Sequence, residues 1–264
     1  MAHSAGLSGL AQVDGPEDFY DWDLICSRLA AQEPWWDPGS ASGYHAITQG
    51  YLIGEDVRRI TGRSFGNFFR EELAEPLDAD FHIGVDPTHF EQIGELIPPG
   101  EVPDGGGDAG SVAARTFGGG NMIDALASRT AAWREAGIPA ANGHGNARSV
   151  TRVQTLLANH GTAFGKSLMS SEGCMRVMEE QVNGTDLVLG VPMRFGLGYG
   201  LNASGAMGPH PNTCFWGGWG GSSIVVDLDG RVCFSYVMNK MDSGVLGDPR
   251  GFGLSKAVFE SLAD

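Results

Sequence analysis

The chain has 264 residues, enough to bury a core, and its 42% hydrophobic and 19% charged residues are typical of a folded globular protein. Its net charge of −15 disfavours binding to nucleic acid or to anionic lipid, because both surfaces attract clustered lysine and arginine. No segment of the sequence approaches the roughly 20 apolar residues that cross a bilayer. We therefore expect one domain over residues 1–264, with no nucleic-acid partner and no membrane span.

Residues 1–7 contain neither a basic region nor an apolar one, so they do not resemble a signal peptide. The cysteines are far apart and form no C-x-x-C pair, which is more typical of buried thiols in a reducing compartment than of a disulfide framework. The sequence alone leaves a disulfide open. The four are Cys26, Cys174, Cys214 and Cys233. On this basis the expected location is the cytoplasm.

Helices are predicted in the first half of the chain. Apolar residues at helical spacing predict a helix over residues 47–60, and Gly62 suits its C-terminal cap. Ser64 is a suitable N-cap for a second helix, which Pro76 stops. Residues 98–120 are rich in proline and glycine and predict a long irregular loop within the domain.

The second half of the chain changes from helices to strands. Further helices are predicted near 122–135, 150–159 and 172–182, and a strand over 193–201. Asp229-Gly230 is a hairpin turn between two apolar strands, 223–228 and 231–238, and a helix over 254–262 closes the chain. Helices followed by antiparallel strands indicate an α+β fold.

Motifs for several other chemistries are missing from the sequence. It has no H-E-x-x-H motif and no cluster of cysteine and histidine, and a polar loop explains Asp80, His82, Asp86 and His89 better than a metal site does. It has no phosphate-binding G-x-x-x-x-G-K-[ST] loop. The sequence over 39–43 approaches the hydrolase motif G-x-S-x-G, but its central residue is alanine. We expect neither a metal nor a cofactor.

Four short segments are informative when taken together. Residues 3–7 read HSAGL, residues 38–46 read PGSASGYHA, residues 50–62 read GYLIGEDVRRITG and residues 216–218 read WGG. In this order and spacing they resemble boxes of the β-lactamase-related serine esterases, relatives of class C β-lactamases and DD-peptidases. The resemblance implies the β-lactamase/transpeptidase-like fold, with a helical region packed on an antiparallel β-sheet and the active site between them.

The resemblance also implies a role for each site residue. Tyr44 would take the proton of a nucleophilic serine and later return one to the leaving alkoxide. Trp216 would wall the substrate pocket, while Gly217 and Gly218 would let the strand approach the substrate and supply one N–H to the oxyanion. His45, next to the tyrosine, is expected to contact the substrate as well.

In this family the nucleophile lies in a Ser-x-x-Lys motif, whose lysine lowers the pKa of the neighbouring tyrosine from its ordinary value of about 10. None of the serines here has lysine three residues later. We therefore expect an N-terminally truncated chain that lacks the nucleophile helix and the first strands of the sheet. Such a chain would be inactive alone and would self-associate through an exposed sheet edge.

The expected substrate is a small-molecule carboxylic ester. His45 and Ala46 stand where lactamases have serine and asparagine, and Trp216 stands where they have lysine. These changes remove polar groups that would hold a β-lactam and its carboxylate, while the tyrosine and the glycine-rich strand remain. The sequence does not specify which ester.

Simpler interpretations stay open at this point. Taken without the resemblance, Tyr44 is more readily explained as a core aromatic residue, and Trp216 and Trp219 are equally well explained as packing residues at a sheet edge. Two other functions also remain: a non-catalytic binding protein that keeps the hydrolase pocket, and an unrelated α+β protein. An in-frame Ser-x-x-Lys segment in upstream coding sequence would favour the esterase over the binding protein.

Overall fold

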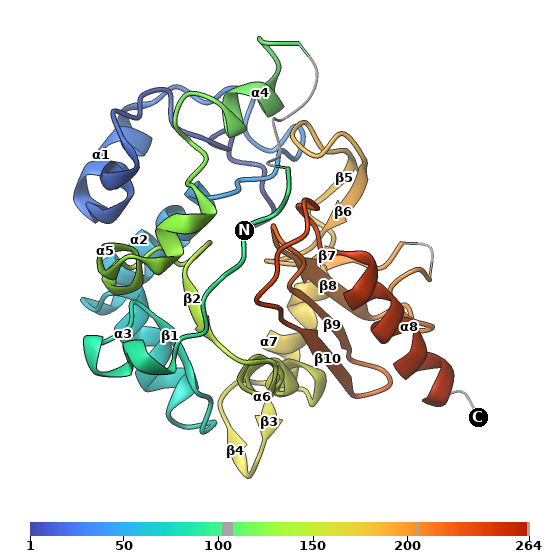
Figure 1. Ribbon diagram of the computed structural model, residues 1–264. Helices are drawn as coiled ribbons and strands as arrows, with labels where there is room; N and C mark the ends of the chain where they lie inside the picture. Colours follow the sequence, from blue (N-terminus) through green and yellow to red (C-terminus); the bar gives the residue numbers. More distant parts are fainter. Residues whose placement is uncertain (102–107, 204, 263–264) are drawn as a thin grey trace.

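The computed structural model describes residues 1–101, 108–203 and 205–262. Helices and loops form one side of the molecule and an antiparallel sheet with its own helices forms the other, and the N-terminus lies between them (Figure 1). The helical side contains α1 (Trp22–Ala31), α2 (Thr48–Thr61), α3 (Phe65–Phe69), α4 (Val112–Phe117) and α5 (Ala131–Glu135). Short 3-10 helices cover Pro16–Tyr20, Pro87–Gln92, Ala125–Arg129 and Arg176–Met178, and a π-helix covers Arg70–Ala74.

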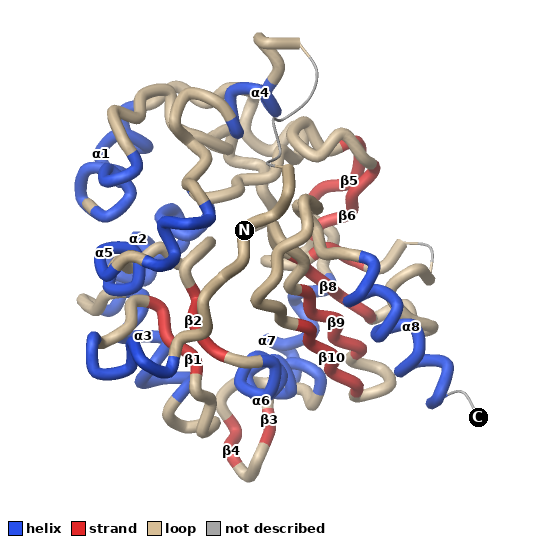
Figure 2. The backbone as a smooth tube through the Cα atoms, viewed as in Figure 1, coloured by secondary structure: helices blue, strands red, loops and turns tan. Residues whose placement is uncertain are grey.

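The main sheet has six strands in the order β10-β9-β8-β7-β6-β5, and every neighbouring pair is antiparallel. Figure 2 draws the strands in red. Its strands are β5 (Val182–Thr185), β6 (Pro192–Phe195), β7 (Gly200–Leu201), β8 (Thr213–Gly217), β9 (Ser223–Asp227) and β10 (Val232–Tyr236). Two small ladders pair β1 (Phe81–Ile83) with β2 (Gly143–Gly145), and β3 (Thr162–Ala163) with β4 (Lys166–Ser167).

Helices cover both faces of the sheet near β10. One face is covered by α6 (Ala147–Ala158), where the Ser235 hydroxyl donates to the Ala147 carbonyl at 2.7 Å. On the other face α8 (Pro249–Leu262) brings Gly251 against the ring of Tyr236. Because neighbouring residues of a strand point to opposite faces, Ser235 and Tyr236 place the two helices on opposite sides. The remaining helix is α7 (Ser171–Met175).

Several elements match the sequence predictions closely. The helix predicted over 47–60 is α2, which ends at Gly62 in the left-handed conformation with φ of 72°. Ser64 caps α3 as expected, since its side chain accepts the N–H of Asn67. The predicted hairpin after the sheet centre is β9 and β10, with Asp229-Gly230 in the turn.

Other elements differ from the predictions for local reasons. The helix predicted near 122–135 is broken at Thr130, whose backbone is extended and whose side chain caps α5. The strand predicted over 193–201 divides into β6 and β7 at a turn that contains Gly198, with φ of 88°. The helix predicted near 172–182 ends early, because β5 begins at Val182.

The loop predicted over 98–120 is not irregular throughout. Ser111 accepts the N–H of Ala114 with its side chain and starts α4 over residues 112–117. Part of the predicted loop, residues 102–107, lies outside the described residues. A single N-cap serine before a short helix is easily overlooked in a glycine-rich sequence.

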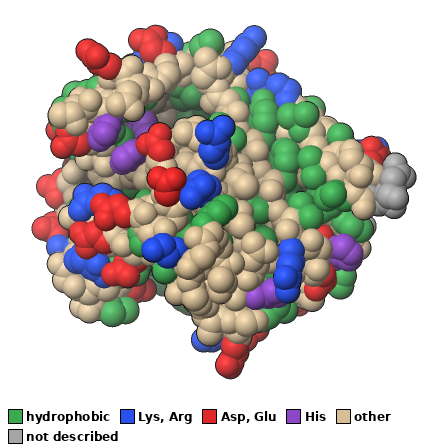
Figure 3. Space-filling model, turned by 90° about the horizontal axis from the view of Figure 1, so that it is seen from below, with side chains coloured by type: hydrophobic (Ala, Val, Ile, Leu, Met, Phe, Trp, Pro, Cys, Tyr) green, Lys and Arg blue, Asp and Glu red, His purple; other side chains and the backbone are tan. Residues whose placement is uncertain are grey.

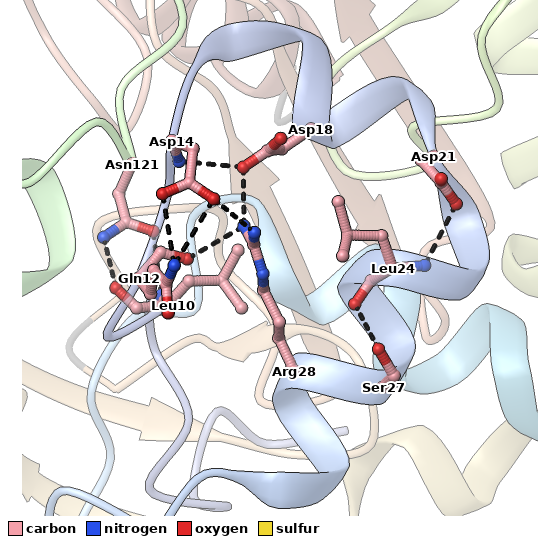
Figure 4. A network of polar contacts seen from close by, with 9 residues as sticks. All are labelled: Leu10, Gln12, Asp14, Asp18, Asp21, Leu24, Ser27, Arg28 and Asn121. Atoms are coloured by element: carbon pink, nitrogen blue, oxygen red, sulfur yellow. Dashed lines mark hydrogen bonds and ion pairs between the residues drawn. The ribbon is translucent and has the colours of Figure 1, made fainter.

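A polar network fixes the N-terminal segment on the helical side (Figure 4). Asn121 accepts the N–H of Leu10 at 2.8 Å and donates to its carbonyl at 2.9 Å. Arg28 of α1 pairs with Asp14 at 2.7 Å and with Asp18 at 2.5 Å. The first residues of the chain are thereby anchored against α1 and the segment before α5, which places residues 3–7 beside the site described next.

All four cysteines are free thiols, and Cys174 and Cys214 are buried. Among the described residues, no helix combines the length and the hydropathy needed to cross a membrane. The outer side of β10 has no neighbouring strand in the described part of the chain, so β10 is an edge of the main sheet.

Candidate active site

A cavity of about 520 Å³ lies between the helical side and the ends of β8, β9 and β10. Most of its lining is apolar, and Asp124 is the only carboxylate among the described lining residues, which include no lysine or arginine. Tyr44 and the segment Trp216–Trp219 both line it, although about 170 residues separate them in the sequence. The structure therefore brings Tyr44, Trp216, Gly217 and Gly218 to one cavity.

Three consecutive amides hold the backbone at Tyr44. The Gly43 N–H donates to the His3 carbonyl at 2.9 Å, and the His45 N–H donates to Nδ1 of His3 at 3.1 Å. Between them, the Tyr44 N–H donates to Oδ1 of the fully buried Asp186 at 3.0 Å. Because the N–H of each of these three residues has an acceptor, the backbone of this stretch has little conformational freedom.

The Tyr44 ring belongs to an aromatic cluster. It meets the rings of His3 and Trp216 edge-on, at centroid distances of 5.3 and 5.4 Å. His3 in turn stacks on Trp216 at 5.2 Å with an interplanar angle of 23°. Phe195 of β6 completes the cluster, at 5.1 Å from His3. Edge-to-face and stacked pairs at these distances are favourable, so the cluster fixes Tyr44 relative to β8.

Burial, and to a smaller extent the Asp186 carboxylate, raise the pKa of Tyr44 to about 12. The phenol is therefore neutral near pH 7, and a nearby cation would be needed to favour the phenolate. The described cavity lining offers no lysine or arginine for this purpose. The serines that line the cavity, Ser128, Ser222 and Ser223, also lack a lysine three residues later.

Backbone hydrogen bonds show which way each residue of β8 faces. The Gly218 N–H donates to the Ser222 carbonyl at 2.9 Å, across to β9. The Asn202 N–H donates to the Thr213 carbonyl at 3.0 Å, on the β7 side. Alternate residues of an antiparallel strand bond to opposite neighbours, so even-numbered residues of β8 face β9 and odd-numbered ones face away from it.

This alternation leaves amide donors free at the end of β8. The β7–β8 register ends at Gly200–Phe215, so in the described part of the chain no strand lies opposite Gly217 on that side. The N–H of Trp219, in the turn that follows β8, also has no backbone acceptor among the described residues. The Gly218 N–H is already used, so Gly217 and Trp219 are the donors that remain for an oxyanion.

Gly217 also has a steric reason to be glycine. A Cβ at this position would lie 2.5 Å from the carbonyl carbon and oxygen of Leu246, which is far below any ordinary contact. A Cβ at Gly218 would meet only the hydroxyl of Ser222, at 3.0 Å. The two glycines thus differ: Gly217 accommodates a neighbouring backbone, and Gly218 does not.

The structure gives His45 a different place from the one expected. His45 is not among the residues that line the cavity, and only 1% of its surface is exposed. Its Nδ1 lies 2.6 Å from the Gly43 carbonyl, and its Nε2 accepts the Leu7 N–H at 3.3 Å. Burial lowers its pKa to about 4. A neutral ring in this position supports the loop and does not reach a ligand in the cavity.

Sequence reasoning assigned no role to Asp186 or His144, and it considered Trp219 as a packing residue at a sheet edge. Asp186 holds the Tyr44 amide, but no local motif marks an aspartate 142 positions away. His144 of β2 lines the cavity, and burial lowers its pKa, so its ring is neutral near pH 7. The indole Nε1 of Trp219 is buried without a partner among the described residues. Both rings are polar groups within a mainly apolar lining.

Comparison with known proteins identifies the family. A family model described as Beta-lactamase matches residues 1–254, which is most of the chain. The chain belongs to the beta-lactamase family. It is 34% identical over 272 residues to the Esterase/beta-lactamase LipL of Mycobacterium tuberculosis (strain ATCC 25618 / H37Rv), in a match that covers 96% of this chain. The chain spans 60% of the length of LipL.

Three solved structures share the fold. A family VIII carboxylesterase is 36% identical, with a TM-score of 0.89 over 98% of this chain and 69% of the other. A penicillin-binding protein homolog from Caulobacter crescentus is 37% identical, with a TM-score of 0.91 and the same two coverages. EstA from Arthrobacter nitroguajacolicus Rue61a is 27% identical, with a TM-score of 0.86 over 99% of this chain and 71% of the other.

These matches confirm the predicted family and the predicted arrangement of helices on an antiparallel sheet. The beta-lactamase fold was recognisable because the four sequence boxes lie on elements that the fold brings together. The truncation and the missing N-terminal strands remain predictions.

Proposed function

We propose that this chain supplies the acid–base tyrosine and the substrate-binding strand of a carboxylic ester hydrolase that works through an acyl-serine. The observation that supports this most strongly is that Tyr44 and the free amides of Gly217 and Trp219 border one cavity. Acyl transfer needs a proton acceptor for the serine and N–H donors for the oxyanion. The relatives named an esterase and a carboxylesterase support the ester as substrate.

In the proposed reaction, the serine hydroxyl attacks the ester carbonyl and its proton passes to the Tyr44 oxygen. The tetrahedral oxyanion accepts the N–H of Gly217 or Trp219. As it collapses, Tyr44 returns the proton to the alkoxide, which leaves as the alcohol, and water releases the acid in a second cycle. The serine and an ammonium that lowers the pKa of Tyr44 would come from a Ser-x-x-Lys segment, which this sequence does not contain.

The cavity favours a neutral ester. Its lining is mainly apolar and its single described carboxylate is Asp124, so an anionic ligand would meet a like charge and no guanidinium or ammonium. A β-lactam carries a carboxylate that Trp216 cannot pair. We therefore expect short-chain activated esters to be bound and β-lactams to be bound poorly.

The chain alone should not form an acyl-enzyme, because no serine has its lysine partner. The test is mass spectrometry after treatment with a serine-directed phosphonate. An unmodified mass supports the proposal. A stoichiometric adduct on any serine of this chain would show that the nucleophile is present after all.

The missing Ser-x-x-Lys motif also supports a second candidate, a binding protein that keeps the hydrolase pocket without its chemistry. Titration with 4-nitrophenyl butyrate, followed by tryptophan fluorescence, separates binding from turnover. Binding without product, together with no in-frame Ser-x-x-Lys segment upstream of Met1, favours the binding protein. An upstream segment that restores hydrolysis favours the esterase.

Self-association through the sheet edge also remains a prediction. β10 is an edge strand in the described part of the sheet, and α8 carries three exposed apolar side chains, Phe252, Leu254 and Leu262. Figure 3 views the molecule from below and shows hydrophobic side chains gathered on its right, the side on which the chain ends in Figure 1. A concentration-dependent sedimentation coefficient supports association, and a constant monomer value argues against it.

A further inference from the structure

We propose that His3 is a positioning residue that holds Tyr44 in its orientation at the cavity. The proposal rests on the proposed function only where it treats Tyr44 as the acid–base group. His3 does not line the cavity, so it acts through Tyr44 and not on a ligand. Three independent features of His3 support this role: its hydrogen bonds, its ring contacts and its backbone conformation.

The hydrogen bonds of His3 flank Tyr44 in the sequence. The His3 carbonyl accepts the N–H of Gly43 at 2.9 Å, and its imidazole Nδ1 accepts the N–H of His45 at 3.1 Å. One residue therefore fixes the amides before and after Tyr44. The direction in which the tyrosine side chain leaves the backbone depends on both amides.

The His3 ring provides a second constraint. It packs against the Tyr44 ring at 5.3 Å with an angle of 73° and stacks on Trp216 at 5.2 Å. His3 thereby connects the loop that carries the tyrosine to the strand that carries the amide donors. A shift of the imidazole would move Tyr44 relative to β8.

The backbone of His3 is held in an uncommon conformation. Its φ is 56°, in the left-handed region that glycine adopts without a steric cost. A histidine in this region is explained by what its side chain does, because the backbone alone would favour glycine. Conformations of this kind persist where the surroundings fix them, and they occur often at functional sites.

The hydrogen bond from His45 also sets the tautomer. Since Nδ1 accepts an N–H, it carries no proton, and in the neutral ring the hydrogen lies on Nε2. Burial lowers the pKa of His3 well below its ordinary value, so the ring is neutral near pH 7. His3 therefore positions Tyr44 without supplying the positive charge that would lower the tyrosine's pKa.

Two variants separate the hydrogen bond from the ring. His3→Asn keeps an acceptor near the position of Nδ1 and suits a left-handed backbone, but it removes the stacked ring. His3→Phe keeps a ring and removes the acceptor. The matched control is His160→Asn, which changes a histidine with φ of 53° outside this cluster.

The measurements are amide hydrogen exchange at Gly43 and His45 and the NMR signals of the Tyr44 ring, assigned by comparison with Tyr44→Phe. We expect His3→Phe to speed exchange at His45 by about tenfold, the effect of one lost hydrogen bond. His3→Asn should restore slow exchange at His45 and still shift the Tyr44 ring signals. His160→Asn should change neither.

The two variants should therefore differ from each other as well as from the parent. If both leave the His45 amide and the Tyr44 ring unchanged, His3 does not position the tyrosine. If both only lower the melting temperature, with the same exchange pattern, its role is general packing. If the variants behave as expected but the parent binds no ester, the positioning proposal stands and the proposed function fails. Should His3→Phe not fold, His3→Asn alone still tests the ring contact.

Discussion

The two walls of the cavity are built in different ways. On one wall, β8 is held by the regular hydrogen bonds of the sheet, and the loop that carries Tyr44 is held by His3 and by the buried carboxylate of Asp186. The other wall comes from residues 93–96, 122–128 and 139–145, which are mainly loops and short turns. In the last of these segments, the fully buried Asn142 bonds to three backbone groups of residues 133–138.

The difference shows how a site can separate chemistry from shape. The first wall presents groups whose direction matters, a phenol and amides that have no backbone acceptor among the described residues. The irregular wall presents apolar side chains whose volume matters more than their direction. Substitutions should therefore affect reaction on the first wall and binding or local stability on the second.

The largest effect is expected at Tyr44. In a protein completed with a Ser-x-x-Lys segment, Tyr44→Phe should lower kcat for 4-nitrophenyl butyrate by about 10² to 10⁴. Folding should be nearly unchanged, since no hydrogen bond of the hydroxyl to the described residues would be lost. The control is Tyr51→Phe, which removes a buried hydrogen bond to the Phe19 carbonyl. That variant should lose stability and keep kcat; full activity in Tyr44→Phe would place the base elsewhere.

The irregular wall should be most sensitive at Asn142. Asn142→Ala leaves the carbonyls of Trp133 and Ala136 and the N–H of Ile138 without their partner. The free energy of unfolding should fall by roughly 3 kcal/mol, because each unsatisfied buried group carries its own desolvation cost. Urea unfolding measures this, with the exposed Asn183→Ala as control. A loss equal to that of the control would show that the wall does not depend on Asn142.

Acid should destabilise the wall that holds Tyr44. The pKa of His45 is lowered from 6.5 to about 4, and burial lowers that of His3 as well. Between these pH values the unfolded chain binds protons that the folded chain does not, so stability is full above pH 6.5 and falls as the pH drops. For His45 alone the change is on the order of 3 kcal/mol.

Unfolding in urea across pH 6.5 to 4 tests this sign. His210 acts in the opposite sense, because its hydrogen bond to Asp227 raises its pKa. It is largely solvent-exposed, so its opposing contribution should be small. Stability that stays level as the pH falls would contradict the predicted neutrality of the buried imidazoles.

The smallest effect concerns the two glycines of β8. Gly217→Ala should lower the free energy of unfolding by roughly 2 kcal/mol, because its Cβ would meet the Leu246 backbone. Gly218→Ala is the matched control, since the Ser222 hydroxyl can rotate away. Equal losses in the two variants would show that the close approach at Gly217 does not constrain the strand.

The sequence predicted those parts of the fold that depend on nearby residues. The period of α2, the cap at Ser64 and the turn at Asp229-Gly230 are all local signals. The family boxes also identified Tyr44 and the strand at Trp216, which the structure brings to one cavity.

What the sequence could not predict depends on distant contacts. Asp186 is 142 positions from Tyr44, and His45 has the residue type of a site group but faces the Leu7 amide. The choice between Gly217 and Gly218 as donor required the register of β8 with its two neighbours. None of these has a periodic or local pattern, because each arises only when separate segments pack together.

The free cysteines have a practical consequence for chemical labelling. Burial raises the pKa of Cys26 to about 11 and that of Cys214 and Cys233 to about 12, and it raises that of Cys174 too. The thiolate is the reactive form, so maleimides should label the folded protein slowly near neutral pH. A cysteine introduced at the exposed position of Ile60 would then be the preferred site for a fluorophore or spin label, with the natural thiols left in place.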